Sequence, residues 1–352
     1  MIIRRFSQAA AVLIAILTPM FASAHEVYVL STDQVGQALA TPSFNMLTVA
    51  KQNSGQFLMW AAIGIVAVFL VLWVSTMPWV EQVFDPILEG FRKYAPFIAR
   101  VTIGISFLAA AYFQASYGPE LPLALNYGTF APLVTGLLVA IGVMCILGLY
   151  VRLAAVVGII LYALSVWNHG WYMLTYINYL GELIVLLILG SHNFSLDNLL
   201  ARGRKGTTAA TTGLHKVQEF LALRSFAILR VLFGTALIYA STYAKIIHND
   251  LALLTVQQYH LDKIMGFEPH FLVLGAAIVE LAIGLFFILG IEIRFTALFF
   301  LFWLSLSLIF FGEAVWPHFM LIGIPIAYLS YGYDRYSVEG WLFRNKKRMP
   351  VL

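Results

Sequence analysis

Two glutamates lie inside long apolar segments, where an ionised side chain is expensive. Glu280 lies near the middle of the apolar run 270–290, and Glu182 lies in the run 173–190. A charged side chain at the centre of a membrane helix costs about 2.5–3.5 kcal/mol on insertion scales, so such residues indicate a function by default. A glutamate there could relay protons, hydrogen-bond a quinone or contact another ligand. The alternative is an ion pair that only fixes helix packing.

Two basic residues of the preceding apolar run, 225–245, could form an ion pair with Glu280. Arg230 lies about a turn and a half inside that run and could reach toward the carboxylate. Lys245, at the other end of the run, reaches it less easily. We therefore predict that Glu280, Arg230 and Glu182 carry the chemistry, since polar groups within a bundle are usually paired.

Histidines offer a second candidate site, for a metal. His169, His270 and His318 lie at predicted outer helix ends, and imidazole suits zinc, copper, iron and nickel. If residues 1–24 are removed, His25 becomes the N-terminal residue and could hold copper through its amine and its ring, as in a histidine brace. No two of these histidines have an i,i+3 or i,i+4 spacing. The alternative is that they are interfacial side chains without a metal.

Several other chemistries have no support in the sequence. Haem b would need histidines well within facing helices, and these lie at helix ends or in loops. The single Cys145 excludes an intramolecular disulfide and a CxxC redox pair. No GxGxxG, Walker loop or nucleophile elbow occurs. We expect no haem, nucleotide or iron–sulfur cluster, and no nucleic-acid partner.

The composition requires lipid as part of the solvent. The chain has 352 residues, of which 61% are hydrophobic and 11% charged, whereas soluble domains have roughly 45–50% apolar and about 25% charged residues. A soluble fold could not bury this much apolar surface with so few charges. A cytosolic enzyme, a secreted disulfide scaffold and a disordered protein are therefore excluded.

The apolar runs predict an all-α polytopic membrane protein with nine spans. A basic start at Arg4 and Arg5, an apolar core over 9–17 and the small residues 22–24 are typical of a secretory signal peptide over residues 1–24. An extracytoplasmic segment is expected over 25–56. The nine runs are long enough for helical spans, and they are 57–77, 97–116, 130–149, 153–169, 173–190, 225–245, 270–290, 295–312 and 317–332.

The placement of positive charge gives the orientation. With the mature N-terminus outside, the outer segments hold only Lys51, Lys245 and Lys263. The inner segments then hold 16 of the 21 basic residues: Arg92, Lys93, Arg100, Arg152, Arg202, Arg204, Lys205, Lys216, Arg224, Arg230, Arg294, Arg335, Arg344, Lys346, Lys347 and Arg348. This excess is the positive-inside pattern, so we expect a bacterial inner-membrane protein with a cytoplasmic C-terminus.

The chain also contains an internal repeat. The turn Ile146-Leu147-Gly148 with Arg152 recurs 142 residues later as Ile288-Leu289-Gly290 with Arg294. The same shift relates Gly181 to Gly323, Gly190 to Gly332, and Ser195-Leu196-Asp197 to Ser337-Val338-Glu339, and a shift of 130 relates Arg100-Val101 and Gly104 to Arg230-Val231 and Gly234. We predict tandem four-helix bundles of the same orientation: unit 1 over 97–200 and unit 2 over 225–342, joined by a basic linker, 201–224, and followed by a basic tail, 343–352.

Each unit resembles the DoxX/DoxD family of small four-helix membrane proteins. The opening Arg-Val-x-x-Gly, the Leu-Gly-x-x-x-Arg turn and the closing Gly with Ser-Leu-Asp carry the resemblance. Unit 2 matches better, because unit 1 has Ala115 and Leu138 where unit 2 has Lys245 and Glu280. The resemblance implies the membrane subunit of a quinone-linked oxidoreductase of the thiosulfate:quinone type, with Tyr239 and Lys245 beside Glu280 and an external redox partner.

Two other function classes stay open. The parallel repeat, the intramembrane acids and the outer histidines also fit a transporter or a copper-handling membrane protein. A non-catalytic anchor or assembly subunit is the third class.

Overall fold

The computed structural model describes residues 29–191, 194–201, 211–311 and 316–342, and no strand occurs among them. The predicted signal peptide, His25 and the basic tail lie outside the described residues. Each of the nine predicted runs coincides with a main helix: α5 (Ser54–Ser75), α7 (Ala95–Tyr112), α9 (Ala131–Leu147), α10 (Val151–His169), α11 (Ile177–Leu189), α13 (Thr211–Thr242), α16 (Pro269–Leu289), α17 (Ile293–Phe311) and α18 (Pro317–Tyr331).

Shorter elements connect these helices. They are α3 (Thr32–Ala40), α4 (Met46–Gln52), α6 (Pro78–Arg92), α8 (Leu123–Tyr127), the 3-10 turns η1 (Gly128–Phe130) and η2 (Gly170–Tyr176), α12 (Leu196–Ala201), the π-helical turn η3 (Tyr243–Ile247), α14 (Asn249–Gln258), α15 (Leu261–Met265) and α19 (Val338–Leu342).

Seven helical stretches among the described residues are long and apolar enough to cross a membrane. One of them, Val151–Leu189, comprises both α10 and α11 together with η2, whereas α18, with 15 residues, is shorter than a typical span. The protein is therefore an all-helical membrane protein.

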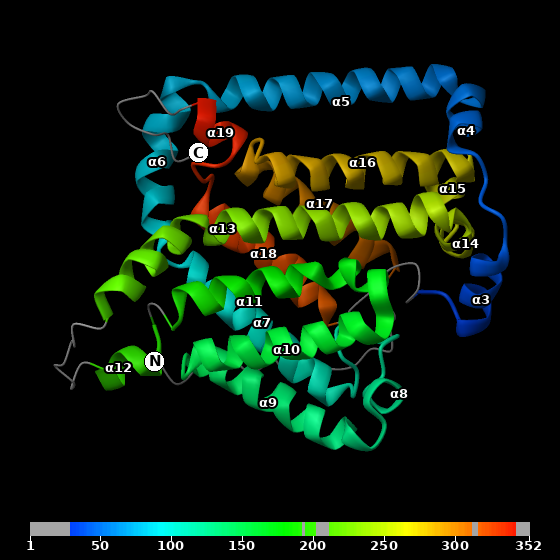
Figure 1. The fold of residues 1–352 in the computed structure, drawn as a ribbon. Coiled ribbons are helices and arrows are strands. Elements are labelled where there is room, and N and C mark those ends of the chain that lie inside the picture. Colours follow the sequence, from blue (N-terminus) through cyan, green and yellow to red (C-terminus); the bar gives the residue numbers. More distant parts are fainter. Residues whose placement is uncertain (1–28, 192–193, 202–210, 312–315, 343–352) are drawn as a thin grey trace, which may run out of the picture.

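The main helices interlock across the two sequence repeats. Helix α7 packs on α9 and α13 packs on α16, but the last helix of each repeat packs most extensively on the first helix of the other one. Thus α11 lies against α13 and α18 lies against α7 (Figure 1). The two repeats are not two separate bundles, because each completes the packing of the other.

Glycines allow the close approaches in this arrangement. Gly104 of α7 faces Gly142 of α9, and Gly234 of α13 faces Gly284 of α16, so that a Cβ added at any of the four would collide with the facing helix. Small residues at such positions let helix backbones approach in a membrane.

Equivalent glycines also make the contacts between the repeats. A Cβ at Gly181 of α11 would lie 2.9 Å from Leu229 of α13, and one at Gly323 of α18 would collide with Thr102 of α7.

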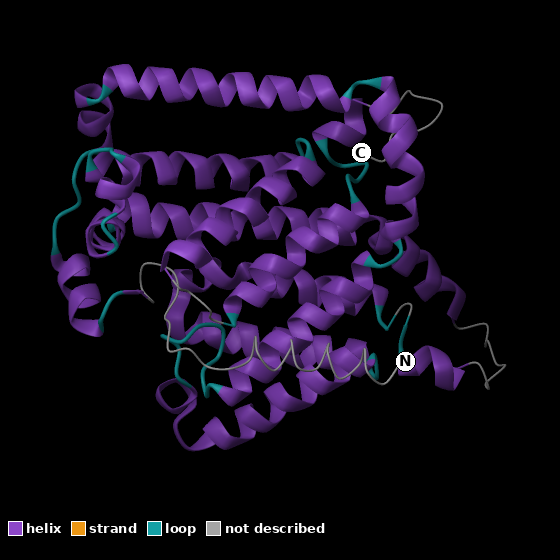
Figure 2. Cartoon of the chain, turned by 180° about the vertical axis from the view of Figure 1, so that it is seen from behind, coloured by secondary structure: helices purple, strands orange, loops and turns teal. Residues whose placement is uncertain are grey.

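The N-terminal part of the described chain surrounds the second repeat. The Asn249 side chain accepts a hydrogen bond from the Phe44 amide (3.1 Å) and donates one to the Phe44 carbonyl (2.8 Å), which fixes the segment between α3 and α4 on the start of α14. From α4, helix α5 runs beside the bundle without burying any of its apolar window, and α6 crosses at the other end (Figure 1, Figure 2). The α5 surface therefore faces lipid.

The bundle has two ends, which are named here by their residues. The arginine end holds Gly148, Gly290 and α19, and lies on the left in Figure 1; the opposite end holds η2, η3, α14 and α15. In Figure 1, successive main helices run alternately to the left and to the right, because each connection joins two helices at the same end of the bundle.

Candidate functional site

A largely buried ion pair joins η3, the turn that follows α13, to α16 toward the opposite end of the bundle. The Lys245 Nζ atom lies 3.0 Å from Glu280 Oε2, and the two side chains are 6% and 20% exposed. Trp303 of α17 directs its Nε1–H at Glu280 Oε1 over 3.4 Å. The helix packing explains the position of Glu280, because this residue lies one helical turn from Gly284, at which α16 contacts α13. Three helices therefore converge on one carboxylate.

Lys245 lies in a π-helical turn. Helix α13 ends at Thr242, and the next five residues, Tyr243–Ile247, form η3, with the His248 amide donating to the Tyr243 carbonyl. Single π-turns are rare and occur frequently at functional sites. The Lys245 side chain reaches Glu280 from this turn. We define Lys245, Glu280 and Trp303 as the ion-pair site.

Tyr239 lies on the same helix as the predicted partners but makes a different contact. Its ring stacks on Tyr243 at 6.4 Å, and Tyr243 in turn contacts His248 and Tyr172. Tyr239 is half-buried, about one and a half turns before Lys245. It thus lies near the ion-pair site without touching Glu280.

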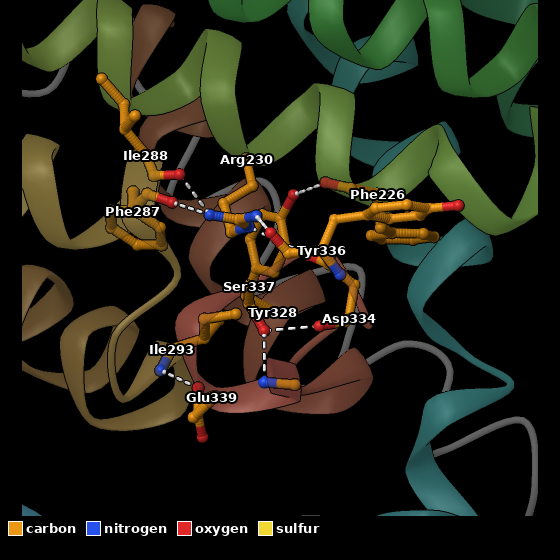
Figure 3. Close-up of polar contacts among 11 residues, drawn as sticks. Phe226, Arg230, Phe287, Ile288, Ile293, Tyr328, Asp334, Tyr336, Ser337 and Glu339 are labelled. Atoms are coloured by element: carbon orange, nitrogen blue, oxygen red, sulfur yellow. Dashed lines mark hydrogen bonds and ion pairs between the residues drawn. The ribbon is translucent and has the colours of Figure 1, made fainter. Parts of the chain in front are cut away.

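Arg230 does not pair with Glu280, so the predicted pairing is wrong. Its guanidinium lies at the arginine end (Figure 3), where it donates to the Phe287 and Ile288 carbonyls (2.6 and 2.5 Å) and pairs with Asp334 at 3.0 Å. Glu280 precedes Phe287 by seven residues on α16, which is about 10 Å along the helix. Arg230 is instead a helix-capping residue, since it satisfies the last carbonyls of α16.

The motif residues of both repeats build the same helix ends. Gly148 and Gly290 have positive φ angles of 67° and 68°, and each ends its helix against the first arginine of its repeat, Arg100 or Arg230. Glycine is favoured there because a Cβ would be strained and would collide with the arginine. Arg100 donates to two carbonyls that follow α11, those of Ser191 and Phe194.

The acidic residue that closes each motif caps the next helix. Asp197 accepts a hydrogen bond from the Tyr150 amide at the start of α10, and Glu339 accepts one from the Ile293 amide at the start of α17. The residues that identify the repeat therefore stabilise helix ends, where backbone groups lack helical partners.

The carboxyls of this end lie outside the spans and are strongly affected by burial. Burial raises the pKa of Glu339 to about 8, against the opposing effect of its hydrogen bond from Ile293. Burial also raises the pKa of Glu292, whose Oε1 accepts a hydrogen bond from Ser75 at the end of α5 (2.6 Å). We therefore expect the stability of the arginine end to depend on pH.

Glu182, the second predicted acid, lies far from the ion-pair site. Its side chain has no exposed surface, and Oε1 accepts a hydrogen bond from the Thr102 hydroxyl of α7 at 3.2 Å. Asn178 and Tyr179, one turn away on α11, are buried with it. Glu182 therefore belongs to the first repeat and is separated from Glu280.

The predicted histidine cluster does not form among the described residues. No group of three or more histidine, cysteine, aspartate or glutamate side chains is placed to hold a metal there. His169 instead hydrogen-bonds Asn126 at 3.1 Å, His270 bonds Glu268, and His318 is buried at the start of α18. His25 lies outside the described residues.

The ion-pair site combines hydrogen-bond donors with an ionisable carboxyl group. Lys245 and Trp303 carry N–H donors, and Glu280 can accept or donate a proton. Sequence reasoning did not include Trp303, because an isolated tryptophan within an apolar run has no distinguishing signal. Comparisons with models of protein families, with curated proteins and with solved structures find no match to this chain. Function is therefore inferred from its own residues and contacts.

Proposed function

We propose that this protein is the membrane subunit of a quinone-linked oxidoreductase, built from two DoxX-like four-helix units in the bacterial inner membrane. In this proposal nine helices span the membrane, with the arginine end in the cytoplasm, where 16 of the 21 basic residues are expected. The equivalent contacts of glycine with glycine and of glycine with arginine in the two repeats support two related units. The interlocked packing means that the two units act as one body.

The observation that carries the quinone proposal is the Lys245–Glu280 pair with Trp303 at its side. Buried ion pairs contribute little to stability compared with apolar packing, so retention of one within the membrane favours a role other than packing. The 20% exposure of the Glu280 side chain leaves one edge of the pair open to a ligand.

The residues present fit a quinone headgroup. Its carbonyl oxygens accept hydrogen bonds, and Lys245, Trp303 and Tyr239 are donors within or beside the site. A bound quinone would supply a two-electron, two-proton acceptor, reduced by electrons from an external redox partner. Glu280 would hold a proton at its carboxyl group, and Lys245 would keep that carboxyl oriented and compensate its charge.

The first experiment is to purify the full chain in nanodiscs and measure bound quinone, metal content and the visible spectrum. The proposal expects bound quinone, lost in Glu280→Gln and retained in Glu268→Gln, a carboxylate that caps α16 outside the site. Unchanged quinone binding and quinol formation in Glu280→Gln would refute it. Copper that depends on His25 would indicate the metal-handling class, and a co-purifying partner with neither ligand would indicate an anchoring subunit.

A further inference from the structure

A second polar feature lies in the first repeat and has no part in the ion-pair site. Glu182 is fully buried, and among the described residues no lysine, arginine or histidine forms an ion pair with it. An ionised carboxylate in apolar surroundings without a cation is strongly disfavoured, so the neutral acid is the favoured form. Thr102 is its hydrogen-bond partner.

The titratable groups on the helices around Glu182 do not compensate its charge. Arg100 of α7 and Arg230 of α13 are bonded at the arginine end. Tyr162 of α10 donates to the Met173 carbonyl. Three groups that interact electrostatically with Glu182 are neutral in their ordinary state: Cys145 of α9, Tyr179 of α11 and Tyr328 of α18.

A line of polar groups leads from Glu182 to the opposite end of the bundle. One turn along α11, the Tyr179 hydroxyl lies beside the Ser106 hydroxyl of α7, although neither makes a hydrogen bond of normal geometry. The Tyr179 ring packs against Tyr117 at 5.0 Å, and Tyr117 packs against Tyr176 at 6.2 Å. Contacts between neighbouring side chains therefore lead from Ser106 through Tyr179 and Tyr117 to Tyr176.

Glu120 ends this line. Its Oε1 accepts hydrogen bonds from Tyr176 (2.5 Å) and Tyr172 (3.0 Å), and the residue is half-buried in the loop that follows α7. It is the acid closest to the opposite end of the first repeat. Its Oε2 is buried without a hydrogen-bond partner, so an ordered water molecule at this atom would link the carboxylate to the water outside.

The line contains an unusual number of buried polar atoms without a partner. Among the described residues these include Tyr117 OH, Asn178 Oδ1 and Glu120 Oε2, besides the Ser106 and Tyr179 hydroxyls. Buried polar atoms are nearly always hydrogen-bonded, to protein or to ordered water. A row of them along one path therefore indicates ordered water molecules between the hydroxyls.

We propose that Glu182 is a proton-binding site of the membrane interior, and that water and hydroxyl groups connect it to the opposite end through Tyr179, Tyr117 and Glu120. A proton from water binds the Glu120 carboxylate. Each hydroxyl or water then accepts a proton on one side and releases one on the other. The last transfer converts the Glu182 carboxylate into a neutral carboxyl, without oxidation or reduction. This path shares no residue with the ion-pair site and does not depend on the proposed quinone.

Infrared spectroscopy of the full chain in nanodiscs tests both parts of this proposal. A neutral Glu182 gives a carbonyl band of a protonated carboxyl, which disappears in Glu182→Gln and shifts in Thr102→Val, a change of similar shape that removes the hydrogen bond. Transfer into D2O then shifts the band as the proton exchanges. We expect Glu120→Gln and Tyr117→Phe to slow this exchange by roughly tenfold or more, because each removes one proton-transfer group.

Tyr162→Phe is the matched control. The Tyr162 ring also contacts Tyr117, at 5.6 Å, but its hydroxyl donates to the Met173 carbonyl and is not part of the line. Exchange at the wild-type rate is expected in this variant. The proposal is overturned if no carboxyl band responds to Glu182→Gln or to Thr102→Val. It is also overturned if Glu120→Gln and Tyr117→Phe exchange as fast as Tyr162→Phe. Thr102→Val keeps the test valid if Glu182→Gln does not fold.

Discussion

Replacement of Lys245 by methionine separates a functional ion pair from a packing clamp. Methionine keeps most of the length of the side chain and removes the charge, so that Glu280 is left within the membrane without its cation. Breaking a fully buried pair costs about 3–5 kcal/mol. The Glu280 side chain is 20% exposed, which reduces the cost. A carboxylate on membrane insertion scales costs about 2.5–3.5 kcal/mol. We expect Lys245→Met to lower the free energy of unfolding by about 2.5 kcal/mol.

The double variant Lys245→Met, Glu280→Leu should be nearly as stable as the wild type. Removal of both charges eliminates the desolvation cost together with the attraction, and such replacements are often neutral. Unless Glu280→Leu alone is stabilising, the coupling energy between the two positions is therefore at least about 2.5 kcal/mol in magnitude. Reversible unfolding in mixed detergent micelles measures the four members of the cycle. Lys263→Met, at an exposed lysine of α15, is the control and should change stability by less than about 0.5 kcal/mol.

Quinone binding by the double variant decides between the two roles. A clamp predicts that the stable double variant binds quinone like the wild type, whereas a headgroup site predicts loss of binding in a folded protein. If Lys245→Met is as stable as Lys263→Met, the energetic reasoning is refuted. If the double variant is stable and still binds quinone, the proposed site is refuted.

Three further predictions concern the helix ends and the interlocked packing. Arg230→Met should cost about 3–5 kcal/mol, because it leaves Asp334 buried without its cation, and an unfolding midpoint equal to that of the wild type would contradict the capping role. The raised pKa of Glu339 means that its contribution to stability is complete below the ordinary value of 4.5 and is lost as the pH rises through about 8. The midpoint temperature of thermal unfolding should therefore fall over this pH range more steeply in the wild type than in Glu339→Gln. Equal slopes in the two proteins would exclude this carboxyl as the source of the pH dependence. A chain divided within 202–210 should reassemble when its halves are co-expressed, because each supplies the helix that packs on the first helix of the other; pull-down of one half through a tag on the other measures this, and halves that fold but do not associate would contradict the packing.

The sequence predicts the main helices well, for a physical reason. In a membrane every backbone group must be satisfied within its own helix, so hydropathy alone determines where the long helices lie. Each of the nine apolar runs coincides with a helix. The η2 turn before α11 and the short α18 are less predictable, because a helix buried among others need not span the bilayer alone.

Side-chain partners are less predictable, because they depend on the register between helices. Arg230 was the expected partner of Glu280, yet the contact of Gly234 with Gly284 places Arg230 beside the last carbonyls of α16. Lys245 reaches Glu280 from a π-turn, and no residue pattern in the sequence indicates that irregularity. The sequence likewise does not predict that the repeats interlock, since Gly181 and Gly323 indicate a close contact but not the helix that makes it.

The comparison between the two repeats separates structural from functional polar residues. Polar residues present in both copies, such as Arg100 and Arg230, hydrogen-bond backbone carbonyls at the arginine end in both. The intramembrane acids are present in one copy each: Glu280 corresponds to Leu138, and the shift that relates Gly181 to Gly323 relates Glu182 to Ile324.

An acid that only held the fold together would be expected in both copies, because both repeats pack by the same glycine contacts. Since Leu138 and Ile324 are buried in equivalent places without any charge, the fold does not require a carboxylate at either position. The fold therefore does not explain Glu280 or Glu182, and the two acids lie in two different polar environments. Glu280 has a cation beside it and a partly exposed side chain, which suits a ligand from the lipid. Glu182 is fully buried without a cation, which suits the binding of a proton.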